Sequence, residues 1–144
     1  MSRRASAVAS DDSEFTFERK TWRRRPYAEI LRDGKAFWEE FAGSKPGFQF
    51  GATKAALIII FLDDIKAFVN SGGVLPGTAE RPKTIEIKGR TLKWHPKFKK
   101  GSGEIEHSYL ELAYGISKIR FGLTKAHALL LFQKELLELA SAKC

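Results

Sequence analysis

The chain has 144 residues, which lies within the size range of a single domain. Hydrophobic residues make up 43% of it and aromatic residues 12%, enough for a packed core, and no stretch is apolar over the roughly 18 residues that a membrane-spanning helix needs. The net charge of +8 and the pI of about 9.7 favour a polyanionic partner, because clustered Lys and Arg release counterions from nucleic acid. A basic surface that only keeps the protein soluble is the alternative.

Residues 1–13 have the composition of a disordered tail. They begin with a Ser- and Ala-rich stretch that contains Arg3 and Arg4 and no acidic residue before Asp11. The same composition is compatible with a short organelle-targeting peptide. The single cysteine, Cys144, has no partner for a disulfide within the chain, so we expect an intracellular location, in the cytoplasm or nucleus.

The first predicted unit, residues 14–70, has the order ββββα. Alternation of apolar and polar residues and the intervening turn residues predict its four strands at Phe15–Phe17, Tyr27–Arg32, Phe37–Phe41 and Phe48–Phe50. Asp33-Gly34 marks a tight hairpin turn, because Gly adopts positive φ at little cost. Thr53 is expected to cap a helix over Lys54–Val69.

A linker at 71–83 leads to a second unit with the same order at 84–142. The linker contains Gly72, Gly73, Pro76 and Gly77, which interrupt helices and strands. The second unit has predicted strands at Thr84–Lys88, Thr91–Lys97, Glu104–Tyr114 and Lys118–Phe121, followed by a helix from Lys125 to about Ala142 capped by Thr124. The sequence therefore predicts an α+β fold in which residues 14–142 form one composite domain of two tandem ββββα repeats, each with a four-stranded antiparallel sheet backed by a helix.

An internal repeat supports this division. Seventy residues separate Lys20–Pro26 from Arg90–Pro96, which share a Thr-x4-Pro spacing, and the same offset relates Phe15 and Phe17 to Ile85 and Ile87. An offset of 71 relates Phe50–Ala55 (FGATKA) to Phe121–Ala126 (FGLTKA). Chance similarity of two amphipathic stretches is the alternative, but two matches in the same order favour a duplication.

Both predicted helices are apolar around most of their circumference. Ala55–Leu62 and Ala128–Phe132 lack the polar face that a surface helix keeps. We expect each helix to be covered by its own sheet and by a second helix, either from the sister unit or from a second chain. Exposure of so wide an apolar face is unfavourable, so the sequence predicts a homodimer or higher homo-oligomer formed through these helices.

Strand alternation divides the side chains between a core face and an outer face. Phe15, Phe17, Phe41, Ile85, Ile87 and Leu112 are predicted to be in the core. Basic residues interleaved with aromatic ones are typical of a single-strand binding platform, since cations follow phosphates and flat side chains stack on bases. The candidate binding residues of this kind are Trp22, Arg23, Arg24, Arg25, Trp38, Lys93, Trp94, Lys97 and Tyr109.

Each candidate also has a structural interpretation. The tryptophans are candidates for the core, and the run of three arginines is also typical of a solvated edge strand. Glu39, Glu40 and Glu111 count against binding if they lie on the same face as the candidate residues.

Signals for catalysis and cofactors are weak. His95, His107 and His127 have no Cys partners and no ligand spacing typical of zinc, and the chain has no Gly-rich phosphate-binding motif. Asp63-Asp64 is a conceivable carboxylate pair, but the corresponding positions of the second unit hold Lys134 and Glu135. We therefore expect neither an enzyme nor a bound metal or cofactor.

The ββββα unit repeated twice in one chain resembles the architecture of the PUR and Whirly single-stranded nucleic-acid-binding proteins. The resemblance covers residues 14–142, and Lys54-Ala55-Ala56-Leu57 is similar to a Whirly motif, although here it falls at the start of a predicted helix. The resemblance implies binding through aromatic and basic residues of the sheets, here the candidate residues given above. It also implies assembly into dimers or tetramers.

These observations lead to the hypothesis of a sequence-tolerant protein that binds single-stranded DNA or RNA without catalysis. The alternative is a protein-interaction module or inhibitor that uses the same basic surface to bind an acidic partner.

Overall fold

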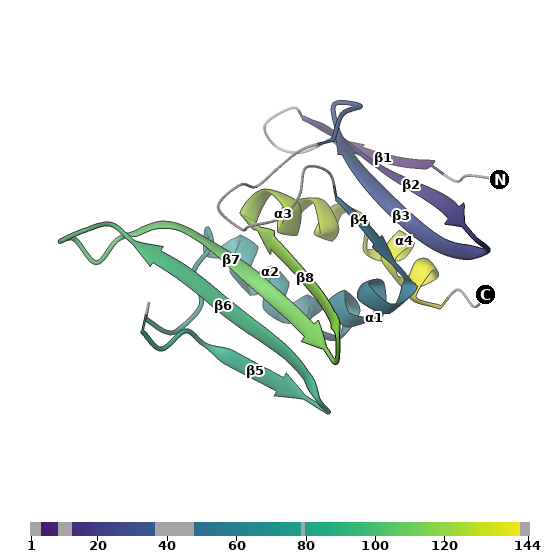
Figure 1. Ribbon diagram of the computed structural model, residues 1–144. Helices are drawn as coiled ribbons and strands as arrows, with labels where there is room; N and C mark the ends of the chain where they lie inside the picture. Colours follow the sequence, from purple (N-terminus) through teal and green to yellow (C-terminus); the bar gives the residue numbers. More distant parts are fainter. Residues whose placement is uncertain (1–3, 9–12, 37–47, 79, 142–144) are drawn as a thin grey trace.

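The computed structural model describes residues 4–8, 13–36, 48–78 and 80–141 of the chain (Figure 1). It contains two four-stranded antiparallel sheets, with strand orders β1-β2-β3-β4 and β5-β6-β7-β8, and each sheet is followed in the chain by two short helices. The first half comprises β1 (Arg4–Val8), β2 (Glu14–Trp22), β3 (Arg25–Arg32), β4 (Gln49–Gly51), α1 (Ala52–Ile60) and α2 (Leu62–Asn70). The second comprises β5 (Thr84–Ile87), β6 (Arg90–Phe98), β7 (Ile105–Tyr114), β8 (Ser117–Gly122), α3 (Leu123–Leu131) and α4 (Gln133–Ala140). The predicted α+β fold with two tandem ββββα units is confirmed.

The first sheet is not built from the four strands that the sequence predicted. Residues 4–8 of the expected disordered tail form β1, whose Ala5 and Ala7 lie opposite Phe17 and Phe15 of β2 and pack against the core. The predicted strand Phe37–Phe41 lies outside the described residues. The small side chains of β1 explain why the strand was missed, because they carry little hydrophobic signal.

The two parts of the sequence repeat differ in how well they match the structure. The FGATKA and FGLTKA strings occupy equivalent places, at the junctions of β4 with α1 and of β8 with α3. The alignment of Lys20–Pro26 with Arg90–Pro96 is wrong, because Lys20–Pro26 spans the turn between β2 and β3 whereas Arg90–Pro96 lies within the single strand β6. The equivalence of Phe15 and Phe17 with Ile85 and Ile87 also fails, because the phenylalanines lie in β2, the second strand of its sheet, whereas the isoleucines lie in β5, the first strand of the other sheet. Ile87 is exposed.

Each predicted long helix is interrupted at a phenylalanine. Phe61 separates α1 from α2 with φ of −103° and ψ of 20°, and Phe132 separates α3 from α4 with φ of −123° and ψ of 39°. Both rings are almost completely buried, and 71 positions separate them. Thr53 and Thr124 do not occupy the predicted capping positions, since Gly51 and Gly122 in extended conformation precede the first helical residues.

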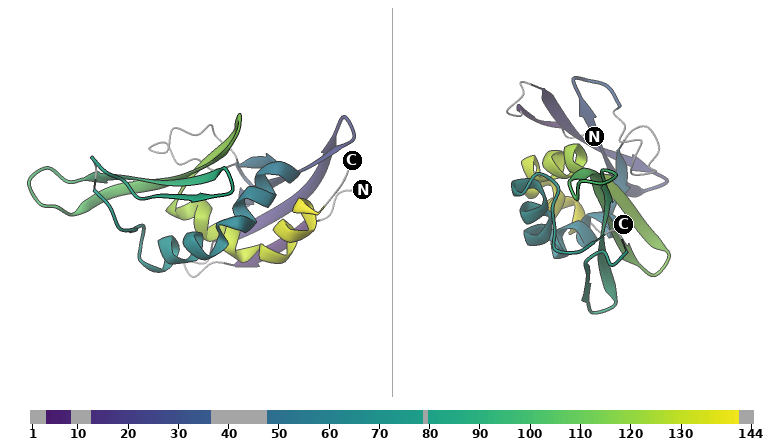
Figure 2. Two further views of the ribbon diagram at one scale, coloured as in Figure 1. Left: turned by 90° about the horizontal axis from the view of Figure 1, so that it is seen from below. Right: turned by 90° about the vertical axis from the view of Figure 1, so that its left-hand side faces the viewer.

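The helices pack across the two halves. α1 contacts α4, α2 contacts α3, and α1 also contacts β7 and β8 of the second sheet. In the right-hand view of Figure 2 the helices lie at the left, the sheet β5–β8 to their right and the sheet β1–β4 above them. The buried residues of both halves form one hydrophobic cluster, which includes Phe17 of β2 in ring contact with Phe132 at 5.5 Å. The sister unit therefore covers the apolar helices within a single chain.

The segment after α2 is fixed to the second sheet by one carbonyl group. The carbonyl oxygen of Gly73 accepts hydrogen bonds from Trp94 Nε1 at 3.1 Å and from the Ser108 hydroxyl, and all of these groups are buried. Gly73 has φ of 102°, and a Cβ at this position would lie 2.9 Å from Ser108 Oγ. This position therefore requires glycine both for its backbone conformation and for the close approach. Among the helices described, none has the length and apolar character needed to cross a bilayer.

Candidate nucleic-acid interface

The turn between β2 and β3 displays an aromatic ring together with three arginines. Trp22 pairs with Arg25 across the strands, which leaves Arg23 and Arg24 as a two-residue turn. Trp22 is 60% exposed, and the Arg23 guanidinium carbon lies 4.6 Å from the centre of an indole ring. Arg24 and Arg25 are exposed, and no carboxylate of the described residues forms an ion pair with either of them. Two of the three cations are therefore available to an anionic ligand.

The backbone of this turn is strained. Arg23 and Arg24 have φ of 48° and 64°, in the left-handed region that non-glycine residues rarely adopt. The turns Asp33-Gly34 and Lys88-Gly89 also have two residues at positive φ, but each has glycine in the second place. Such strain persists where the surrounding structure imposes it, and it is most frequent at functional sites. An arginine in place of the usual glycine is thus consistent with a binding role for this turn.

A surface hollow of about 480 Å³ adjoins the turn. The hollow is lined by the indole of Trp22, the phenol of Tyr27, the guanidinium of Arg25 and the amide of Gln49. Pro26, Phe50 and Gly51 complete the lining. This set can stack on a flat ring, pair with an anion and form a hydrogen bond. A nucleotide has the matching groups, which are a flat base, a phosphate and hydrogen-bonding atoms on the base edge.

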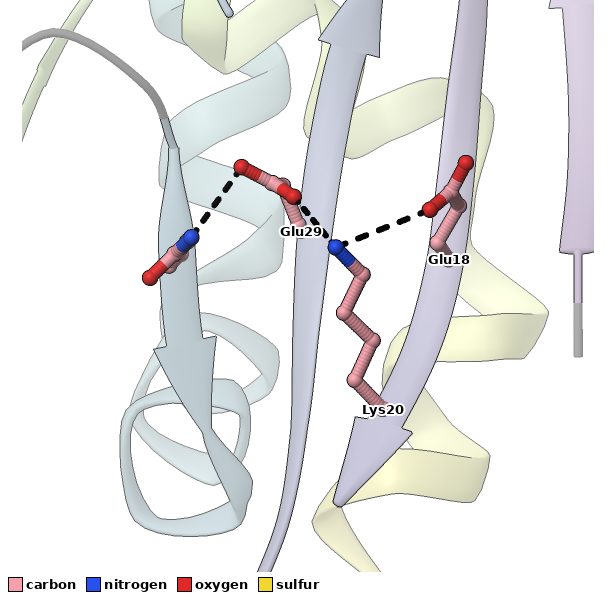
Figure 3. Close-up of polar contacts among 4 residues, drawn as sticks. Glu18, Lys20 and Glu29 are labelled. Atoms are coloured by element: carbon pink, nitrogen blue, oxygen red, sulfur yellow. Dashed lines mark hydrogen bonds and ion pairs between the residues drawn. The ribbon is translucent and has the colours of Figure 1, made fainter. Parts of the chain in front are cut away.

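A polar cluster on the outer face of the first sheet holds the amide of this hollow in place (Figure 3). Lys20 Nζ lies 2.7 Å from Glu29 Oε1 and 3.8 Å from Glu18 Oε2. Gln49 Nε2 donates to Glu29 Oε2 at 3.1 Å. The hydrogen bond from Lys20, aided by that from Gln49, holds the pKa of Glu29 below its usual range despite partial burial. The same bond raises the pKa of Lys20.

The second sheet has a corresponding cluster around Glu111. Arg120 Nε donates to Glu111 Oε2 at 2.6 Å, Lys118 Nζ lies 3.9 Å from the same oxygen, and His95 Nε2 lies 3.7 Å from Oε1. Burial acts to raise the pKa of Glu111, but the hydrogen bond from Arg120 and the charges of Arg120, Lys118 and His95 outweigh it, so the pKa is lowered. The His95 ring stacks on Tyr109, with ring centres 4.8 Å apart.

The strand registers show that the two clusters occupy equivalent positions. Glu29 pairs with Gln49 of β4, and Glu111 pairs with Arg120 of β8. Tyr27 and Tyr109 are likewise equivalent, since they pair with Gly51 and Gly122, the residues that precede α1 and α3. The sheets therefore share a carboxylate and a tyrosine but differ at one place, where the first has an amide and the second has an arginine.

The structure separates the candidate residues that the sequence grouped together. Trp94 is 1% exposed and donates a hydrogen bond to Gly73, so its assignment as a base-stacking residue is wrong. Trp22 and Arg23–Arg25 form a hairpin tip instead of the predicted strand surface. Lys93, Lys97 and Tyr109 lie on the outer face of the second sheet together with Glu111, the carboxylate that counts against binding there. Trp38 lies outside the described residues.

Sequence reasoning missed the contribution of Lys20, Tyr27, Glu29 and Gln49. A signal for Lys20, Tyr27 and Glu29 exists, because Lys20 and Trp22 are two residues apart on one strand, and Tyr27 and Glu29 are two apart on the next. Side chains with this spacing point to the same face. The hairpin turn at Arg23-Arg24 brings these two pairs together, and this turn was not predicted.

Within the described residues, no group of three or more His, Cys, Asp or Glu side chains is placed to hold a metal ion. Comparison of the sequence with protein-family models and with curated proteins gives no match.

Proposed function

We propose that this protein binds single-stranded nucleic acid through the β2–β3 hairpin tip and the adjacent hollow. The observation that carries the proposal is the exposed Trp22 ring, flanked by Arg23–Arg25 beside a nucleotide-sized hollow. Trp22 stacks on an unpaired base, while Arg24 and Arg25 contact phosphates. The proposed kinship with PUR and Whirly proteins rests on the two ββββα units.

The second sheet contributes longer-range attraction in this proposal. Its outer face and the β6–β7 loop carry exposed Lys93, Lys97, Lys99 and Lys100. Lys97 and Lys99 lie 3.9 and 3.7 Å from Glu106 and Glu104, in exposed ion pairs that solvent screens strongly. Figure 1 shows the β6–β7 and β2–β3 connections at opposite ends of the molecule, so the two basic regions are not one continuous platform.

The proposal is tested by fluorescence anisotropy with a labelled single-stranded oligonucleotide over a range of salt concentrations. We expect affinity that falls as salt rises, with a slope that decreases by about one for each phosphate-contacting arginine changed to alanine. Lys134→Ala removes an exposed positive charge from α4 and serves as the control for charge alone. Absence of binding at low salt, or binding without salt dependence, would refute the proposal.

A pair of matched variants tests the stacking role. Trp22→Ala is expected to weaken binding by about 1–3 kcal/mol, the usual contribution of one stacked base. Tyr114→Ala is the control, because Tyr114 is 46% exposed and has the Arg90 guanidinium 4.5 Å from its ring centre, yet it lies in the second sheet away from the hairpin. Equal losses in the two variants would contradict a specific role for Trp22.

A protein with an acidic surface is the competing partner for the same arginines. Retention of a bound protein after nuclease treatment, together with no affinity for single strands, would favour that alternative.

Homodimer formation through the helices stays a prediction. The sister unit covers the helices within one chain, which reduces the need for a second copy. Ile60 and Leu137 are nevertheless 37% and 55% exposed, and they are the apolar helix residues that a second copy would cover. Light scattering of the purified protein measures the oligomeric state directly.

A further inference from the structure

The amide of Gln49 has one fixed orientation in the hollow. A carboxylate only accepts hydrogen bonds, so the amide group facing Glu29 must be the nitrogen, and Gln49 Nε2 donates to Glu29 Oε2 at 3.1 Å. The other oxygen of Glu29 accepts from Lys20 at 2.7 Å, which holds the carboxylate in place and keeps it ionised. The carbonyl oxygen of Gln49 is therefore held on the side away from Glu29, and the side chain cannot reverse its amide without placing two oxygens together.

This arrangement places a fixed hydrogen-bond acceptor among the residues that line the hollow. Gln49 Oε1 is an acceptor, the Glu29 carboxylate lies directly behind the amide, and Glu18 lies on the same face of the neighbouring strand. Trp22 and Gln49 both line the hollow, so in the proposed binding mode a base that stacks on Trp22 presents its edge to Gln49. Cytosine, adenine and guanine carry an exocyclic amino group that donates to such an acceptor, whereas uracil and thymine have a carbonyl group at position 4 and only the ring N3–H as a donor on that edge.

We propose that the Gln49 carbonyl, held by Glu29, selects amino-bearing bases over uracil and thymine at the Trp22 hollow. This inference rests on the proposed single-strand binding. Glu29 acts as a positioning residue, because it orients Gln49 without a contact of its own to the base. The second sheet lacks this selection, because Arg120 occupies the position equivalent to Gln49. Arg120 is a hydrogen-bond donor and is bound to Glu111, so it offers no acceptor to a base.

Two oligonucleotides of about ten nucleotides, one of deoxycytidine and one of deoxyuridine, provide the sharpest comparison. The two pyrimidines have the same size and charge. At position 4 cytosine has an amino donor and uracil an oxygen, and at position 3 cytosine has an acceptor nitrogen and uracil an N–H donor. One additional neutral hydrogen bond predicts about three- to tenfold tighter binding of the deoxycytidine strand.

Variants assign the preference to its residues. Gln49→Met keeps the length of the side chain without the acceptor and should reduce the ratio of the two dissociation constants to about one. Glu29→Gln allows the amide of Gln49 to reverse and should also lower the ratio. Glu111→Gln changes the equivalent carboxylate of the second sheet and should leave the ratio unchanged. Circular dichroism and urea unfolding confirm that each variant is folded.

The outcomes separate this inference from the function on which it rests. Tight, salt-dependent binding of both strands with equal affinity would overturn the base selection and leave single-strand binding intact. A preference that persists in Gln49→Met would overturn the assignment to Gln49. Failure to bind either strand at low salt would overturn both proposals.

Discussion

The two described tryptophans, Trp22 and Trp94, show how differently one residue type is used, and they give opposite expectations on mutation. Trp94→Ala removes a large buried side chain and a hydrogen bond to Gly73, so we expect a loss of about 3–5 kcal/mol in the free energy of unfolding. Trp22→Ala removes an exposed ring and should change this free energy by less than about 0.5 kcal/mol. Urea unfolding monitored by circular dichroism measures both, and a similar loss in the two variants would contradict the assigned roles.

The two clustered carboxylates predict how stability depends on pH. Folding lowers the pKa of Glu29 and Glu111 below the ordinary value of 4.5, so each contributes stability above that pH, and the contribution is lost as the pH falls through the lower value of the folded protein. We expect the urea midpoint of the wild type to decrease as the solution is acidified below about pH 5. A Glu29→Gln, Glu111→Gln double variant should show a weaker dependence over the same range. An unchanged dependence would show that other carboxylates dominate acid unfolding.

At the scale of residues, sequence patterns predicted the core better than the site. Phe15, Phe17 and Leu112 are buried as expected from their alternation with polar residues. Leu92 and Trp94 are two residues apart and share a buried face, so the same rule applied strictly to β6 also assigns Trp94 to the core. Alternation places Lys20 on the face of Trp22 and Glu29 on the face of Tyr27, but it does not predict the contact of Lys20, Glu29 and Gln49, which depends on the pairing of three strands.

At the scale of elements, the β2–β3 turn combines binding residues with unfavourable backbone geometry. Glycine adopts positive φ without the cost of about 1–2 kcal/mol that a side chain imposes, so Arg24→Gly should raise the free energy of unfolding by up to about that amount. The same variant should bind single strands more weakly, because it loses one cation. Arg25→Gly is the control, since Arg25 lies in β3 and its φ is not positive, and it should lose affinity without gaining stability.

The helices illustrate a limit of prediction at the same scale. Hydrophobic periodicity located both helical regions to within about two residues at the start, because the apolar runs are long. The interruptions at Phe61 and Phe132 have no local signal of the usual kind, since neither proline nor glycine is present. They follow from tertiary packing, because the helix neighbours change at each buried ring. At Phe61 the neighbour changes from α4 to α3, and at Phe132 it changes from α2 to α1.

At the scale of the whole molecule, the packing of α1 against α4 and of α2 against α3 makes the two halves depend on each other. We expect separate fragments, 1–77 and 78–144, to lack cooperative unfolding transitions, because each exposes the helix faces that the other covers. Mixing the fragments should restore helical circular dichroism and a cooperative transition. A cooperatively folded single fragment would show that its own sheet is sufficient to cover its helices.

The anchoring of Gly73 also determines where the chain can be lengthened. An insertion near Gly72–Leu75 displaces the carbonyl that Trp94 and Ser108 bind, so it disturbs the second sheet as well as the connection. Thr78 and Arg81 are exposed, and two hydrogen bonds join them, from the Thr78 N–H to the Arg81 carbonyl and from the Arg81 N–H to the Thr78 hydroxyl. A fluorescent or affinity tag inserted between Glu80 and Arg81 lies between two exposed residues, and loops accept added length at a small entropic cost. The connection therefore has a fixed part at Gly72–Leu75 and a part next to Arg81 that tolerates added residues. We expect a reporter placed next to Arg81 to leave the β2–β3 hairpin tip and the helices unaltered.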